Sequence, residues 1–279
     1  MPTGILPLPC PALPAAGAQK GVTVEIGGLP IFLESDDADF RALVEQRYAG
    51  YVNPAATPTY RFEIRLEPPA RSPGEDVRVY KNGSAWRFER GDFRAEWDAH
   101  SRRGWVRQSP NPYSIDSVLR IVHSLVLAEE GGFLVHAASG VRRGRAFAFA
   151  GISGAGKTTL ARLAPPDVAV LTDEISYIRR CEGGYRAYGT PFAGELGRAG
   201  VSLKAPIAAL YFLEKGPGGR IEPMGQLAAA RELLRNILFF AHDPALVSRV
   251  FESAIEFVAR VPAGRFTFAP DERAWELVR

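Results

Sequence analysis

The sequence predicts an α/β domain preceded by an antiparallel β-rich module, and two patterns carry this prediction. From residue 22 to about residue 108, apolar and polar residues alternate in short runs, as they do in strands with one buried face. After residue 132, apolar strand-like runs alternate with helix-like segments, which is typical of an α/β domain with a largely buried sheet. We place the junction near residues 110–132.

The composition is that of a folded protein without a polyanionic partner. The chain has 279 residues, of which 46% are hydrophobic and 23% are charged, so it can bury one large core or two modest ones. Its net charge of +3 is spread along the chain, and we expect no nucleic-acid binding. Cys10 and Cys181 form no disulfide or zinc motif, and no apolar run approaches the roughly 18 residues that span a bilayer. These features predict a cytoplasmic protein without membrane contact.

The first 112 residues divide into a leader and the β-rich module. Five prolines in residues 1–20 predict a mobile leader without regular structure. Over residues 21–112, six alternating runs predict strands: VTVEI, YRFEIRL, VRVY, SAWRFE, FRAEW and GWVRQ. Turn-forming residues at 81–84, 90–92 and 101–104 separate the last four runs, so we expect an antiparallel meander. A helix from Asp36 to about Gln46 interrupts it.

A connecting helix over residues 113–130 opens the second part, residues 113–279. Its apolar residues recur at helical spacing from Ile115 to Val126, and two glycines follow Glu130. Beyond it we expect strands at 133–138, 146–150, 168–178, PIAALYFLE and RFTFA, and helices after the glycine-rich loop, at about 225–240 and at 243–260. One side of the last helix predicts a core or oligomer contact through Leu246, Val247, Val250, Phe251, Ala254, Ile255 and Val258.

The most specific motif is a phosphate-binding loop that begins at Gly151. GISGAGKTT matches G-x-x-x-x-G-K-[ST] at every fixed position, with an apolar strand before it and a helical run after it. The glycines let backbone amides converge on a phosphate, the lysine reaches the β- and γ-phosphate oxygens, and the Thr158 hydroxyl completes a Mg²⁺ shell. The candidate nucleotide-binding residues are Gly151, Ser153, Gly154, Ala155, Gly156, Lys157, Thr158 and Thr159.

Two carboxylates and a histidine are the candidate partners of this loop. The apolar run from Val168 ends at Asp173 and Glu174. Carboxylates at the carboxyl end of a strand beside a phosphate loop can hold Mg²⁺ directly or through water; the alternative is a strand that leaves the core through two solvated acids. His136 lies in the apolar strand at 133–138, where it is either a hydrogen-bonded core residue or a site residue.

The stretch LVHAASGVRRGRAFAFAGISGAGKTTL, followed by VAVLTDE, resembles the catalytic domain of HPr kinase/phosphorylase. It also resembles the nucleotide site of ATP-dependent phosphoenolpyruvate carboxykinase. Both families have a histidine in a strand before a hairpin, then G-x-S-G-x-G-K-[ST], then a strand that ends in two acidic residues. The resemblance covers about residues 133–178, extends loosely to about 270, and implies a P-loop kinase domain of the HPr kinase/phosphoenolpyruvate carboxykinase type.

The resemblance also implies roles for individual residues. Lys157 would neutralise the β- and γ-phosphates, and Thr158 would ligate Mg²⁺. Asp173 matches the acid that accepts the proton of the attacking serine hydroxyl, Glu174 matches a metal-side or phosphate-side carboxylate, and His136 matches the site histidine. The sequence departs from the family at Glu174, where aspartate is usual, and in lacking the family's second glycine-rich signature. Residues 1–110 do not resemble the N-terminal domain of HPr kinase.

Three further residues are weaker candidates. Glu195 and Arg198 lie in YGTPFAGELGRAG, a polar segment that either covers the nucleotide or holds an acceptor, or else is a solvated hairpin. Arg235, in the helical run RELLRNILFF, either reaches a phosphate or is solvated and salt-bridged.

These features together predict an ATP- and Mg²⁺-dependent kinase. The acceptor that we expect is a serine of a small protein or peptide, and the resemblance adds ribosomally made peptide precursors, which stand-alone relatives modify. The β-rich module would hold such a chain by strand addition. A small-molecule kinase and a regulatory ATP-binding module are the alternatives. The presence of both Lys157 and Asp173 argues against the regulatory module, because binding alone needs no base.

Overall fold

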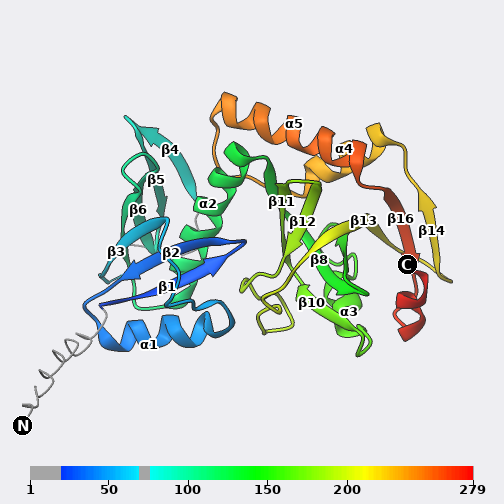
Figure 1. Cartoon of the computed structure of the whole chain (residues 1–279), viewed down its shortest axis with the longest axis horizontal. Helices are drawn as coiled ribbons and strands as arrows, with labels where there is room; N and C mark the ends of the chain where they lie inside the picture. The colour runs from blue at the N-terminus through cyan, green and yellow to red at the C-terminus, as the bar shows by residue number, and fades with distance from the viewer. Residues whose placement is uncertain (1–19, 69–75, 279) are drawn as a thin grey trace, which may run out of the picture.

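The computed structural model describes residues 20–68 and 76–278, which form two sheets joined by a long central helix (Figure 1). Both sheets mix parallel and antiparallel pairs, and the first one makes the N-terminal part β-rich. The predicted α/β class with a β-rich N-terminal part is therefore confirmed. The leader predicted for residues 1–20 and Cys10 lie outside the described residues, apart from Lys20.

The first sheet contains seven strands among the described residues, in the order β1-β2-β3-β7-β6-β5-β4. The strands are β1 (Gly21–Ile26), β2 (Leu29–Glu34), β3 (Tyr60–Leu66), β4 (Arg78–Asn82), β5 (Ala85–Arg90), β6 (Phe93–Asp98) and β7 (Arg103–Gln108). From β4 to β7 they form the predicted antiparallel meander. The meander does not extend to β3, which runs parallel to both β2 and β7. The crossover through α1 (Ala38–Arg47) and the 3-10 helix η1 (Ala49–Tyr51) lies between β2 and β3 and lets these two strands run in the same direction.

The central helix α2 (Pro112–Glu130) holds the two sheets together (Figure 1). It begins one residue before the predicted range, because the Asn111 side chain accepts hydrogen bonds from the Tyr113 and Ser114 amides, and it ends at Gly131 in the left-handed region. The helix packs against β7 of the first sheet and β8 and β11 of the second. One apolar cluster runs through both parts of the chain, and it includes Val106, Leu119 and Tyr177.

The second sheet contains nine strands among the described residues, and β8 is its hub. The strands are β8 (Gly132–Arg142), β9 (Arg145–Ala150), β10 (Val168–Thr172), β11 (Ile175–Cys181), β12 (Gly184–Tyr188), β13 (Lys204–Lys215), β14 (Arg220–Pro223), β15 (Ile237–Leu238) and β16 (Ala263–Phe268). β8 pairs with β9 and β15 along one edge and with β10 and β11 along the other. The pairings β8–β9, β9–β13, β13–β12, β12–β11 and β11–β8 form a closed circuit.

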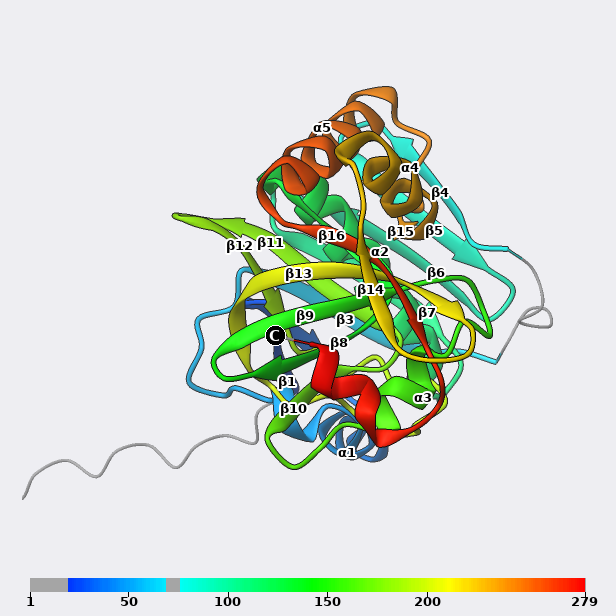
Figure 2. The same cartoon turned by 90° about the vertical axis from the view of Figure 1, so that its right-hand side faces the viewer.

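Alternation along β9 separates two packed layers. The alanines at 146, 148 and 150 join the cluster with Leu233 and Phe257, which come from α4 (Gln226–Asn236) and α5 (Pro244–Arg260). The phenylalanines between them face α3 (Lys157–Arg162) and the 3-10 helix η2 (Glu272–Leu277). Figure 2 shows α4 and α5 above the sheet and the C-terminal η2 below them. The sequence RAFAFA therefore positions helices on both sides of the strand that leads into the glycine-rich loop.

Three predicted elements differ in the structure. The predicted strand over 168–178 is two strands, β10 and β11, which are interrupted at Asp173 and Glu174. The predicted helix to about residue 240 ends at Asn236, because residues 237–238 pair with β8. The apolar stripe of α5 is only half buried: Leu246, Val250, Ala254 and Val258 are in the core, whereas Val247, Phe251 and Ile255 are 40–51% exposed. Among the described residues, no helix is both long and apolar enough to cross a bilayer.

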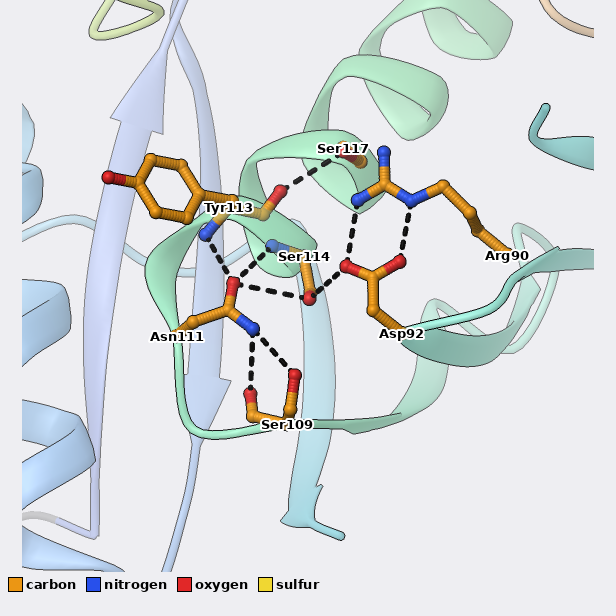
Figure 3. A network of polar contacts seen from close by, with 7 residues as sticks. All are labelled: Arg90, Asp92, Ser109, Asn111, Tyr113, Ser114 and Ser117. Atoms are coloured by element: carbon orange, nitrogen blue, oxygen red, sulfur yellow. Dashed lines mark hydrogen bonds and ion pairs between the residues drawn. The ribbon is translucent and has the colours of Figure 1, made fainter. Parts of the chain in front are cut away.

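A polar network fastens the first sheet to α2 (Figure 3). Buried Asp92, in the turn between β5 and β6, accepts two hydrogen bonds from Arg90, at 2.5 and 2.8 Å, and one from the Ser114 hydroxyl at 2.7 Å. Burial alone would raise the pKa of Asp92, but the bonds from Arg90 and Ser114 lower it below its usual value. The charged form of Asp92 therefore stabilises the junction between sheet and helix.

We expect Asp92→Asn to lower the free energy of unfolding by about 2 kcal/mol at pH 7, because Arg90 and Ser114 lose their charged acceptor. The loss should shrink as the pH falls through and below 3.8, the ordinary pKa, since the wild-type carboxylate is then protonated as well. Urea denaturation at several pH values measures it. Glu45→Gln, at an exposed position of α1, is the control and should change stability by less than about 0.5 kcal/mol. An equal loss at all pH values would contradict the role of the charge.

Candidate phosphate-binding site

The glycine-rich loop connects β9 to α3. Gly154 and Gly156 have φ angles of +77° and +106°, in the left-handed region that side chains other than glycine rarely adopt. A Cβ at position 156 would also lie 2.9 Å from the ring of Phe268, in β16. These two positions let the chain curl tightly before it enters α3.

The ammonium group of Lys157 is held inside this loop. The residue is only 7% exposed, and its Nζ donates hydrogen bonds to the carbonyl oxygens of Gly151 at 2.8 Å and Ile152 at 3.0 Å. Burial lowers the pKa of Lys157, while the charges of Glu174 and Glu195 act in the opposite direction. The loop thus holds one cation that is shielded from water and faces two carboxylates.

Strand register brings the loop, His136 and the acidic pair together. On one edge of β8, Ala137 pairs with Ala150, the last residue before the loop. On the other edge, His136 pairs with Ile175, and the Ala137 amide donates to the Glu174 carbonyl at 3.0 Å. Because paired strands lie about 5 Å apart, the start of the glycine-rich loop and the acidic pair lie on opposite sides of Ala137 in β8.

Asp173 holds the segment that faces the loop. It is 3% exposed, and its two carboxylate oxygens accept hydrogen bonds from the amides of Gly194 and Leu196, each at 3.0 Å. A Cβ at position 194 would lie 2.8 Å from Asp173 Oδ2, so glycine is required there. Asp173 therefore fixes the backbone at residues 194–196.

Glu174 has a different environment. Its carboxylate is half-buried and forms no hydrogen bond or ion pair within residues 20–68 and 76–278. Burial raises its pKa above the usual value; the charge of Arg120 opposes this, the charge of Asp173 adds to it, and the charge of Lys157 opposes it. Glu174 is consequently a carboxylate with free oxygens and an increased affinity for a proton.

His136 is half-buried and lines a cavity that Lys157 and Glu174 also line. Burial and the nearby charge of Lys157 lower its pKa, so the ring is neutral at neutral pH. His123 of α2 has a different environment. His123 is fully buried, has no hydrogen-bond partner among the described residues, and has its pKa lowered by burial to about 3.

These groups surround a cavity of about 690 Å³. It is lined by His136, Ser153, Gly154, Gly156, Lys157, Thr158, Thr159, Asp173, Glu174, Ala193, Gly194, Glu195 and Lys215. Most of the residues predicted from the sequence are therefore neighbours. Gly151 and Ala155 belong to the loop but do not line the cavity, and Arg198 lines a separate groove. Arg235 lies on α4, where it pairs with Glu232 at 3.1 Å outside the cavity, as the solvated alternative predicts.

Two further residues, Lys215 and Arg120, act at the cavity although the sequence does not predict them. Lys215 ends β13, which runs parallel to β9 with Phe212 opposite Ala150. Ligands of α/β sheets bind at the carboxyl ends of parallel strands, and this parallel pairing is the signal that points to Lys215. The Arg120 guanidinium lies 5.0 Å from the ring centroid of Phe192, and its charge acts on Glu174. Nothing in the helical pattern of α2 distinguishes Arg120 from a solvated arginine.

Mg²⁺ fits part of this donor set. No group of three or more histidine, cysteine, aspartate or glutamate side chains in the described part of the chain could hold a metal ion. Mg²⁺ that accompanies a nucleotide needs fewer protein ligands, because phosphates and water supply the others. Thr158 and Glu174 border the cavity with their side-chain oxygens in no hydrogen bond among the residues described, whereas both oxygens of Asp173 are engaged. The first two residues therefore fit the ion better.

Comparison with known proteins gives one family. The family model described as SynChlorMet cassette protein ScmC matches residues 111–278, which is more than half of the chain. The matched residues include α2, the glycine-rich loop and the acidic pair. No curated protein matches the sequence.

We expect Glu174→Gln to raise the Tm by roughly 2–4 °C at pH 7, because it removes a charge that the fold disfavours but that solvent partly screens. A raised pKa means that the folded protein binds this proton more tightly than the unfolded chain does. The advantage of the variant should therefore shrink as the pH falls toward 4.5, the ordinary pKa. Thermal unfolding followed by circular dichroism measures it, with Glu45→Gln, at an exposed position of α1 outside the cavity, as the control. A lower Tm for Glu174→Gln at pH 7 would show that its attraction to Lys157 outweighs its burial.

Proposed function

The chain belongs to the family of SynChlorMet cassette protein ScmC, and we propose that it is an ATP- and Mg²⁺-dependent kinase of the HPr kinase-like type. The acceptor in this proposal is a serine hydroxyl of a small protein or peptide. One observation carries it: a phosphate-binding loop with a buried lysine opens into a cavity that also holds a free carboxylate, Glu174, and a neutral histidine, His136. Phosphate binding alone requires neither of these two groups.

The cavity suits the charge of a nucleoside triphosphate. Lys157 and Lys215 both line it, together with residues of the glycine-rich loop. The Lys157 ammonium now donates to two loop carbonyls, and a phosphate would offer it a stronger, charged acceptor. The Thr158 hydroxyl would hold Mg²⁺, and the ion would neutralise phosphate charge, while Glu174 would remain free to accept a proton.

The proposed reaction is a direct phosphoryl transfer. The acceptor Oγ forms a bond to the γ-phosphorus, the bond from that phosphorus to the β–γ bridging oxygen breaks, and ADP leaves. The hydroxyl proton passes to a carboxylate. Free oxygens and a raised pKa support Glu174 as this acceptor, while the two backbone bonds of Asp173 support a role in positioning the loop at 194–196. This exchanges the roles that the family resemblance implies for the two acids.

We expect Lys157→Ala to weaken ATP binding by roughly 10- to 100-fold, because the triphosphate loses a charged hydrogen-bond donor. Phosphotransfer should be lost. A fluorescent ATP analogue measures binding, and γ-labelled ATP with a lysate from the source organism shows whether label reaches a protein. Arg231→Ala, an exposed position on α4, is the matched control and should bind ATP normally. Undiminished ATP binding by Lys157→Ala would refute the loop assignment, and label on a metabolite alone would favour a small-molecule kinase.

Replacement of each acid should separate the two roles. We expect Glu174→Gln to lower kcat by roughly 10²- to 10⁴-fold with ATP affinity nearly unchanged, because it removes the proton acceptor. In Asp173→Asn, the side-chain NH₂ must face one of the two amide donors, so the segment 194–196 should loosen and the KM for the acceptor should rise. Steady-state kinetics and amide hydrogen exchange at 194–196 measure these effects. If Asp173→Asn loses more kcat than Glu174→Gln while amide hydrogen exchange at 194–196 is unchanged, the proton acceptor is Asp173 and not Glu174.

A further inference from the structure

A second groove adjoins the phosphate cavity at Asp173, which lines both. The groove has a volume of about 310 Å³ and lies between the end of α3, the strand β10 and the segment 196–201. β10 runs from Val168 toward Asp173 and the acidic pair. A ligand that lies along β10 in this groove therefore reaches the phosphate cavity at the Asp173 end.

One wall of this groove is the outer edge of a sheet. β10 is the last strand in the sheet order and pairs with β8 along one side only. On its other side, the Val201 amide donates to the Val170 carbonyl at 2.9 Å, so the backbone of Val170 faces outward. Strand alternation turns Val168 the same way. The Val168 amide donates to the Pro165 carbonyl, also at 2.9 Å, so backbone of the same chain already covers much of this edge, and the groove offers its side chains to a ligand.

The groove carries positive charge and exposed apolar surface. Arg162 and Arg198 both line it, both are exposed, and neither forms an ion pair or a hydrogen bond within the part of the chain that the structure describes. Val168, Val170 and Val201 contribute apolar walls, and Val201 is 49% exposed. Two unpaired guanidinium groups beside valine side chains complement a segment that alternates acidic and apolar residues.

We propose that this groove docks an extended, acidic segment of the phosphate acceptor, with the phosphorylated residue at the Asp173 end. The inference rests on the proposed kinase function and adds the chemistry of its acceptor. The carboxylates of the segment pair with Arg162 and Arg198, and its apolar residues lie against the valine side chains of the groove. The serine then enters the cavity next to Glu174, because Asp173 forms the common wall.

The test uses the full chain without nucleotide and two labelled peptides of about eight residues, which extend over roughly 26 Å. One is Glu-Val-Asp-Leu-Ser-Glu-Val-Asp, and the other has lysine in place of each acid. Fluorescence anisotropy at low salt should show that the wild type binds the acidic peptide at least about 10-fold more tightly than the basic one, and that added salt weakens binding. The double variant Arg162→Glu/Arg198→Glu should reverse this preference. Arg231→Glu/Arg249→Glu, two exposed arginines of α4 and α5, changes the net charge equally and should keep it.

Equal binding of the two peptides by the wild type, or an unchanged preference in the Arg162→Glu/Arg198→Glu variant, would overturn the proposal. So would displacement of the acidic peptide by a single-stranded oligodeoxynucleotide at a lower concentration than by unlabelled peptide. ATP binding is measured on the same proteins and should be unchanged, since neither arginine lines the phosphate cavity. If the wild type binds the acidic peptide but not ATP, the kinase function fails and the docking groove stands. If the wild type binds ATP but shows no preference between the peptides, the docking groove fails and the kinase function is not contradicted.

Discussion

The burial of the Lys157 ammonium is the constraint on which the site depends. A cation that is 7% exposed must find acceptors inside the protein, and the loop supplies two carbonyl oxygens while Glu174 and Glu195 supply charge. Removing this charge from water costs desolvation free energy in the free protein. Under the proposed function, a polyphosphate in the cavity would offer the ammonium stronger acceptors than the loop carbonyls, so the cost of burying Lys157 in the free protein would add to the affinity for an anion.

The break between β10 and β11 gives two adjacent acids different environments. In a continuous strand, Asp173 and Glu174 would point to opposite faces of the sheet. Instead, the register of β10 against β8 shifts between Val170 and Thr172, and the chain resumes pairing at Ile175, opposite His136. Between these two strands, the Asp173 carboxylate accepts from the amides of residues 194 and 196, and the Glu174 carboxylate stays free in the cavity. A single backbone irregularity thus separates a structural carboxylate from one that is available for chemistry.

Local sequence patterns predicted most of the helices and strands and most of the residues that line the cavity. They did not predict the features that depend on contacts between segments far apart in the sequence. The sequence predicts α1, α2, the strands from β4 to β9 and the loop, because periodicity, caps and glycines are local signals. It does not predict that β3 runs parallel to two neighbours or that residues 237–238 leave a helix to pair with β8, since those outcomes depend on contacts far along the chain. Lys215 joins the cavity for the same reason: only the pairing of β13 with β9 brings it there. The bonds that engage Asp173 come from a segment about 20 residues later, so spacing alone made the two acids look equivalent.

The N-terminal part acts on the site through the segment that follows β12. Thr190 and Val201 bond to the carbonyls of Leu171 and Val170 in β10, and the Tyr51 hydroxyl of η1 donates to the Gly200 carbonyl at 2.9 Å. A Cβ at Gly200 would collide with the Leu171 carbonyl at 1.6 Å, so this backbone lies directly on β10. The segment forms one wall of the phosphate cavity through residues 193–195 and one wall of the neighbouring groove through residues 196–201. Since Tyr51 belongs to the first part of the chain and Asp173 to the second, the position of this shared wall is set from both parts at once. The β-rich module is therefore a structural support of the cavity wall, whatever molecule enters there.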